Sequence, residues 1–133
     1  MAYVGKTYKF QKHENFSEFL THVGVPADKA DFLLSAKPSQ KLEKDGDNYT
    51  LTTIDASTKE LKFKDGVEFE ETITPEIKAK TTFTVSGDVV TQVQKFEDGR
   101  SITLKRVYSG DQLVVEITVT GWDNVARRYY SAA

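Results

Sequence analysis

The chain has 133 residues, no cysteine and a formal net charge of -2, with 38% hydrophobic and 29% charged residues. This length predicts one domain, over residues 1–133, with room for a single core or a single cavity. The absence of cysteine excludes disulfides and thiolate chemistry, and the weak negative charge excludes a general attraction to nucleic acid. The N-terminus, Met1 to Lys6, lacks the apolar run of a signal peptide, and no segment reaches the roughly 20 apolar residues of a membrane helix, so we expect a cytoplasmic monomer.

The first elements are a strand and two short helices. Residues 3–11 alternate between apolar and polar side chains, which predicts a half-buried strand. Asn15 is a favoured N-cap residue, and Glu18 stands where it can complete a capping box. A second helical stripe follows and ends before Pro38, so a helix-turn-helix is predicted over about residues 15–36. The apolar stripe of the first helix has helical spacing: Phe16, Phe19, Leu20 and Val23.

From Pro38 onward, turn signals recur about every ten residues. Pairs such as Asp65-Gly66 and Asp98-Gly99 supply the positive φ that hairpin turns require. The runs between them, for example Asn48 to Ile54 and Leu113 to Thr120, are rich in β-branched and aromatic residues. With the N-terminal strand these runs make ten strands. The even spacing predicts an all-β fold, a ten-stranded antiparallel up-and-down β-barrel that closes to remove its edges.

A barrel of ten strands encloses more space than side chains can fill. If the apolar members of each strand face inward, the same alternation turns several polar residues inward as well. Buried polar groups without partners are costly, so a dry packed core would not tolerate them. We therefore expect a wet cavity lined in part by Gln40, Gln92, Gln94 and Arg106.

The last strand, Val125 to Tyr130, contains two Arg-x-Tyr pairs, and one of them must face the barrel interior. An inward arginine beside a tyrosine hydroxyl suits a carboxylate, because the guanidinium offers a planar fork of charged donors and the phenol adds one more. The spacing alone leaves open whether Arg127 with Tyr129 or Arg128 with Tyr130 points inward.

Several short segments stand in a fixed order along the chain: Tyr8-x-Phe10, Asn15-Phe16-Ser17-Glu18-Phe19-Leu20, Lys37-Pro38, Gly66 to Glu71, Thr103-Leu104-Lys105-Arg106 and Arg128-x-Tyr130. Together they resemble the intracellular lipid-binding protein family, specifically the cellular fatty-acid-binding proteins, and the tail from Trp122 looks most like insect members. The resemblance covers essentially the whole chain. It implies a non-enzymatic carrier, without a cofactor, that binds one long-chain fatty acid in a barrel closed by a helix-turn-helix lid between strands 1 and 2.

The resemblance also implies a set of site residues. It places the ligand carboxylate near Arg106, Arg128 and Tyr130, with Gln40 within reach, and it favours Arg128 over Arg127 because a valine stands three residues before it. A buried ion pair between an arginine and Glu71 is the alternative. Gln92 and Gln94 are expected to hold ordered water. The cavity entrance would be bordered by Phe16, Val23, Val25, Leu34, Ile54, Ala56, Thr74 and Ile77.

Other function classes are less well supported by the sequence. His13 and His22 are spaced for neither a zinc pair nor a base beside a nucleophile, so we expect no metal and no catalysis. The helical segment is too acidic to read DNA, so we expect no nucleic acid partner. A retinoid or bile-acid carrier would use the same barrel and remains the alternative. Beyond the ligand, we expect only transient contact with membranes or lipid-metabolising proteins.

Overall fold

The structure is a computed structural model that describes residues 2–55, 57–74 and 77–133. Over these ranges two helices interrupt a succession of ten strands. The helices are α1 (Phe16–Val23) and α2 (Ala27–Ser35), and the strands are β1 (Thr7–Glu14), β2 (Ser39–Asp45), β3 (Asn48–Ile54), β4 (Thr58–Lys64), β5 (Phe69–Thr74), β6 (Ile77–Ser86), β7 (Val89–Lys95), β8 (Ser101–Ser109), β9 (Gln112–Val119) and β10 (Ala126–Ala132).

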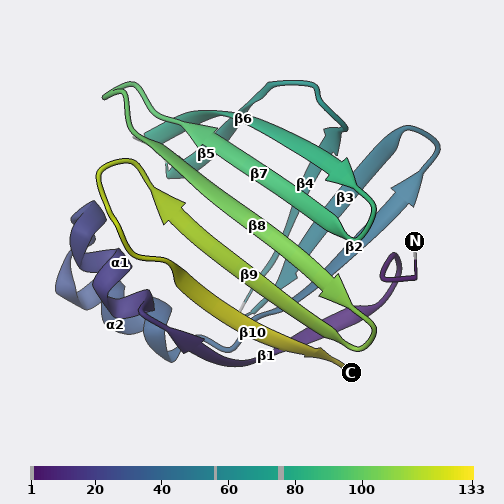
Figure 1. The fold of residues 1–133 in the computed structure, drawn as a ribbon, viewed down its shortest axis with the longest axis horizontal. Helices are drawn as coiled ribbons and strands as arrows, with labels where there is room; N and C mark the ends of the chain where they lie inside the picture. The colour runs from purple at the N-terminus through teal and green to yellow at the C-terminus, as the bar shows by residue number, and fades with distance from the viewer. Residues whose placement is uncertain (1, 56, 75–76) are drawn as a thin grey trace.

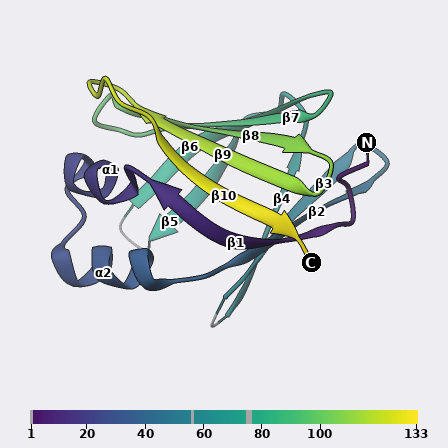
Figure 2. The same ribbon diagram turned by 60° about the horizontal axis from the view of Figure 1, so that its bottom comes forward.

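All ten strands belong to one sheet in the order β4-β3-β2-β1-β10-β9-β8-β7-β6-β5. Each pair of neighbours in that order is antiparallel. The sheet curls into a nearly closed barrel, and no ladder joins its outermost strands, β4 and β5, within the described ranges (Figures 1 and 2). The predicted fold class is therefore confirmed.

The strand β1 begins later than the sequence indicates. It runs from Thr7 to Glu14, whereas the alternation predicted residues 3–11. Gly5 has a φ of 86° in a turn before the strand, a conformation that favours glycine and breaks an extended run. A bulge between Phe10 and Lys12 then shifts the register against β10, so the simple alternation fails beyond that point.

The two ends of the barrel differ. Both helices lie at one end, and both chain termini lie at the other (Figures 1 and 2). A cluster of tyrosines is packed near the terminal end: Tyr3 stacks on Tyr108 at 4.0 Å between ring centroids, and Tyr8 meets Tyr108 edge-on at 5.4 Å. The Tyr3 and Tyr8 hydroxyls donate to the carbonyl oxygens of Gly87 and Gly110. Side chains therefore close this end.

The helices at the other end are held unequally. Helix α1 buries Phe16, Phe19 and Leu20, and Gly24 ends it with a φ of 83°. Helix α2 buries none of its residues, and its Phe32 is 64% exposed. α1 is thus fixed to the barrel by an apolar face, whereas α2 mainly covers α1 and the barrel mouth.

The predicted capping box at the start of α1 is wrong. Asn15 makes no side-chain cap and adopts a left-handed conformation with a φ of 56°. Asparagine tolerates this conformation better than most residues. Its amide nitrogen instead donates to the carbonyl oxygen of Val125 at 3.2 Å, which ties the helix entrance to the chain just before β10.

Candidate functional site

The two candidate arginines lie on either side of one buried residue, Val115 of β9. Arg106 of β8 and Arg128 of β10 are both register partners of Val115, which is 3% exposed. Directly paired residues share a face of the sheet, so both arginines face the interior. Two inter-strand spacings of about 4.8 Å put their Cα atoms roughly 10 Å apart.

The register also separates the two Arg-x-Tyr pairs of β10. Tyr130 is 4% exposed and belongs to the core, together with the inward Arg128. Arg127 faces the other way, and its Nε lies 3.2 Å from Glu116 Oε2 in a partly exposed ion pair. Tyr129 likewise contacts Glu14 on the outside. The structure thus turns Arg128 and Tyr130 inward.

Arg106 has polar side chains for neighbours. It is 7% exposed, and its Nε donates to Gln40 Oε1 at 3.3 Å while its Nη1 donates to Gln92 Oε1 at 2.9 Å. Burial lowers the pKa of Arg106, and the negative charge of Glu71 is among the influences that raise it again. Gln40 and Gln92 both turn their side-chain oxygens toward the guanidinium, as expected beside a cation that can only donate hydrogen bonds.

Glu71 of β5 completes this network from the far side. Its Oε1 accepts hydrogen bonds from Thr81 Oγ1 at 2.8 Å, Gln92 Nε2 at 3.0 Å and Gln94 Nε2 at 3.1 Å. Gln92 therefore bridges the two charges, since its oxygen accepts from Arg106 and its nitrogen donates to Glu71. Among the described residues no direct ion pair joins an arginine to Glu71, because Gln92 lies between Arg106 and the carboxylate. Gln92 and Gln94, expected to hold water, donate to the carboxylate.

Arg128 has aromatic neighbours instead. Its guanidinium carbon lies 4.8 Å from the ring centroid of Phe10, 4.5 Å from that of Phe16 and 6.0 Å from that of Tyr130. Its Nε and Nη2 are buried and have no hydrogen-bond partner among the described residues. Such contacts attract a cation to the ring faces, but they satisfy none of its N–H donors. Buried donors without acceptors are rare and costly, so this arginine is poised for an anion.

The charges of the interior support the same conclusion. Arg106 and Arg128 bring two positive charges, and Glu71 brings one negative charge, all facing inward. One positive charge is therefore left over, on the side of Arg128. In a medium of low dielectric constant an unmatched charge favours a ligand that carries one opposite charge.

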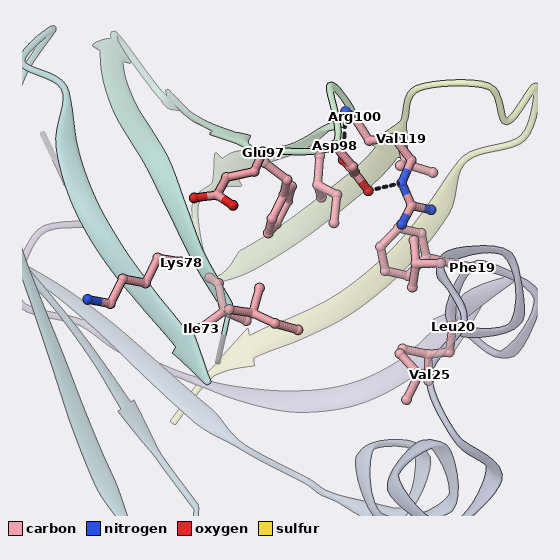
Figure 3. A pocket seen from close by; sticks show the side chains of 13 residues that line it. Phe19, Leu20, Val25, Ile73, Lys78, Glu97, Asp98, Arg100 and Val119 are labelled. Atoms are coloured by element: carbon pink, nitrogen blue, oxygen red, sulfur yellow. Dashed lines mark hydrogen bonds and ion pairs between the residues drawn. The ribbon is translucent and has the colours of Figure 1, made fainter. Parts of the chain in front are cut away.

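Two cavities formed by described residues concern the site. One, of about 550 Å³, is shown in Figure 3. Its apolar lining comes from α1 and the turn after it, from β5, β6, β8 and β9, and from the turn between β7 and β8. The charged lining residues are Lys78, Glu97, Asp98 and Arg100. In Figure 3 Arg100 lies above Phe19, and Asp98 beside it accepts a hydrogen bond from its Nε at 2.8 Å. A volume of this size suits a small apolar ligand.

The smaller cavity, of about 170 Å³, borders the polar network. It is lined by Leu51, Thr53, Lys59, Leu61, Glu71, Gln92, Gln94, Leu104 and Arg106. Arg128 and Tyr130 line neither of these two cavities, and the rings of Phe10 and Phe16 lie against the guanidinium.

The expected entrance residues are placed in several ways. Val23, Val25 and Ile77 line the larger cavity, and Phe16 lies against Arg128. Leu34 is half-buried against the core, whereas Ile54 is 41% exposed. Ala56 and the side chain of Thr74 lie outside the described residues. The sequence reasoning missed several cavity residues that come from distant elements: Phe19, Leu20, Ile73, Phe96, Ile102 and Val119.

Metal-ligating clusters and membrane-crossing helices are two further features that the described part of the chain could contain. No group of three or more histidine, cysteine, aspartate or glutamate residues there could hold a metal ion. None of the described helices is long and apolar enough to cross a membrane.

The fold and its cavities define a ten-stranded β-barrel whose interior has room for a small ligand. The model of the Lipocalin / cytosolic fatty-acid binding protein family matches residues 4–129, and the chain belongs to this family. Fatty acid-binding protein 2 of Manduca sexta is 46% identical over 133 residues, which cover 99% of this chain and 100% of that protein. The predicted family resemblance is confirmed, and so is the expectation of a binding protein that is not an enzyme, because the family and these relatives are binding proteins.

Solved structures agree with this assignment. A fatty-acid-binding protein isolated from Manduca sexta superimposes with a TM-score of 0.90 at 46% identity, over 98% of this chain and 99% of that one. A fatty acid-binding protein from brain tissue of Drosophila melanogaster superimposes with a TM-score of 0.88 at 33% identity, over the same shares of the two chains.

Proposed function

We propose that this protein is an intracellular, monomeric carrier, formed by one domain over residues 1–133, that binds one long-chain fatty acid and holds its carboxylate at Arg128. The observation that carries the proposal is the pair of buried guanidinium donors, Nε and Nη2, that lack an acceptor among the described residues. Relatives named as fatty acid-binding proteins supply the ligand class.

The head group is assigned to Arg128, with Tyr130 beside it and Arg106 further away. The Arg106 Nε and Nη1 are already used by Gln40 and Gln92, whereas the Arg128 donors are free to bind. A carboxylate brought into an apolar interior without a partner would lose its charge or cost several kcal/mol. Two charge-assisted hydrogen bonds from one guanidinium remove that penalty and fix the orientation of the ligand.

The acyl chain is assigned to the apolar part of the interior. The cavity of about 550 Å³ has a largely apolar lining, and it lies between α1 and the turn between β7 and β8. Each buried methylene contributes about 0.8 kcal/mol. Most of the affinity would therefore come from the chain, and the head group would decide which end enters first.

The proposal is tested by comparing a fatty acid with the alcohol of the same chain length. Replacing Arg128 by Gln should weaken the acid by about 1–3 kcal/mol, the range for hydrogen bonds to a charged group. The alcohol should lose much less, because it has no charge to satisfy. Displacement titration of a fluorescent fatty acid measures both affinities.

The matched control is Arg127→Gln, the same substitution one residue earlier on the outer face, where Arg127 pairs with Glu116. It should leave both affinities nearly unchanged. Equal losses for acid and alcohol in the Arg128 variant, or a larger loss in the Arg127 variant, would contradict the assignment. Tighter binding of a retinoid or bile acid than of any long-chain fatty acid would contradict the ligand class and leave the head-group assignment standing.

A further inference from the structure

The polar network around Arg106 leaves two groups unmatched, and both residues line the cavity of about 170 Å³. All three hydrogen bonds to Glu71 arrive at Oε1, so Oε2 has no donor among the described residues. Arg106 donates through Nε and Nη1, and within the same ranges its Nη2 has no acceptor. The cavity thus presents one strong acceptor and one strong donor from residues that are 6% and 7% exposed.

The charge around this cavity differs from that around Arg128. Glu71 and Arg106 compensate each other through Gln92, so this buried pair is neutral as a unit. The third charged residue of the lining, Lys59, is exposed to solvent, which screens its charge. A second carboxylate placed there would meet Glu71, and an ammonium group would meet Arg106 and Lys59. A neutral group that both donates and accepts, such as a hydroxyl, matches one unmatched acceptor and one unmatched donor without adding a charge.

The size and the position of the cavity further restrict which ligands can place a hydroxyl there. A volume of about 170 Å³ holds several waters, which is room for a hydroxyl and a few methylenes. Arg106 and Arg128 are separated by two strand spacings, about 10 Å between Cα atoms. A hydroxyl in the cavity must therefore lie several carbons from a carboxylate held at Arg128.

We propose that the Glu71–Arg106 cavity is a second polar subsite, which accepts a hydroxyl carried in the middle of a long-chain fatty acid. The hydroxyl donates to Glu71 Oε2 and accepts from Arg106 Nη2. The inference rests on the proposed function, because it assumes that the carboxylate of the same ligand is held at Arg128. It makes mid-chain hydroxylated fatty acids ligands of this barrel alongside the unsubstituted acids.

The first test compares three ligands on the unmodified protein by isothermal titration calorimetry. They are octadecanoic acid, the same acid with a mid-chain hydroxyl, and the methyl ether of that hydroxyl, which can no longer donate. An unpartnered hydroxyl in an apolar site would weaken binding about tenfold or more. We expect the hydroxylated acid to bind within about threefold of the parent acid or more tightly, and the ether to bind at least about tenfold more weakly than the hydroxylated acid.

The second test replaces Glu71 by Gln and uses Glu70→Gln as the matched control. Glu70 precedes Glu71 on β5 but points outward, where its Oε1 lies 3.4 Å from Lys78 Nζ. In the Glu71 variant the three donors hold the amide oxygen, and its nitrogen faces the cavity as a donor. In the Glu71 variant the hydroxylated acid and its methyl ether should bind with about equal affinity. In the Glu70 variant the ratio of the two affinities should be the same as in the unmodified protein.

The outcomes separate this inference from the proposed function. One outcome would contradict the hydroxyl subsite and leave the proposed fatty-acid carrier intact. In it, the binding of octadecanoic acid depends on Arg128, but the hydroxylated acid binds about tenfold more weakly than octadecanoic acid and no more tightly than the ether. If octadecanoic acid does not bind, or binds independently of Arg128, both are wrong. An unchanged ratio in a folded Glu71→Gln protein also overturns the subsite, and the ligand comparison on the unmodified protein decides the matter if that variant does not fold.

Discussion

Arg106 and Arg128 start from the same position in the sheet and end in opposite surroundings. Each is a register partner of the buried Val115, and each faces the barrel interior. Around Arg106, β2, β5, β6 and β7 contribute three amides, a carboxylate and a hydroxyl that form a connected network. Around Arg128, β1 and α1 contribute the rings of Phe10 and Phe16, which leave two donors unmatched.

This difference indicates that the neighbours of a buried arginine determine whether it stabilises the fold or remains available to bind a ligand. A guanidinium that already donates to buried amides is part of the folded framework, because removing it would leave those partners buried and unpaired. A guanidinium held by ring faces alone keeps its charge and its donors available. We therefore expect stability to depend on Arg106 and ligand orientation to depend on Arg128.

The largest expected effect is on stability at Arg106. Replacing Arg106 by Met should lower the free energy of unfolding by about 3–5 kcal/mol, because Glu71 would be left as a buried charge and Gln40 and Gln92 would lose their donor. Urea unfolding of the ligand-free protein measures the change. Lys105→Met, at the exposed neighbouring position, should change stability by less than about 0.5 kcal/mol. A small loss at Arg106 would remove the contrast between the two arginines.

A second effect concerns Tyr108, which lies two residues beyond Arg106 in β8. Burial raises the pKa of Tyr108 to about 12, so the folded protein favours the neutral phenol. A raised pKa contributes stability that is present below the ordinary value of about 10 and is lost as the pH rises toward about 12. Tyr108→Phe should therefore retain more of its stability than the unmodified protein between pH 10 and pH 12. Parallel losses in the two proteins over that window would argue against a buried titrating phenol.

The smallest expected effect is on stability at Arg128. Replacing Arg128 by Met removes ring contacts worth about 0.5–1 kcal/mol each, but it also removes two buried donors that have no acceptor. We expect the two changes to offset each other within about 1 kcal/mol in the ligand-free protein, again measured by urea unfolding. A loss as large as that of the Arg106 variant would mean that Arg128 also belongs to the framework.

Most of the fold could be predicted because local patterns agree with it. Turn pairs and alternating strands indicated ten strands, and the helical stripe of Phe16, Phe19 and Leu20 is buried in α1 as expected. The local patterns gave a wrong prediction where the conformation of a side chain depends on a residue far away in the sequence. Asn15 was expected to cap its own helix, but its side chain bonds the Val125 carbonyl 110 positions away.

The site was only partly predictable for the same reason. Alternation indicated that Gln92, Gln94 and Arg106 face inward, but only the assembled barrel brings Glu71 of β5 to Gln92 of β7. The spacing in β10 allowed either Arg127 or Arg128 to face inward, and pairing with Val115 decides for Arg128 in the structure. The aromatic contacts of Arg128 had no sequence signal, because Phe10, Phe16 and Arg128 come from three separate elements.

The central claim is that a fatty acid is held as a carboxylate by Arg128, and the pKa of the bound acid tests it most directly. An acid labelled with carbon-13 at its carboxyl can be titrated by NMR in complex with the unmodified protein and with the Arg128→Gln variant. We predict that in the unmodified protein the bound carboxyl stays ionised to a pH below about 4.3, the ordinary value for a carboxyl of this kind, because an adjacent cation lowers its pKa. In the variant the pKa should rise above that value, since burial then acts without a compensating charge. A bound carboxyl that titrates at the same pH in both proteins would contradict the claim.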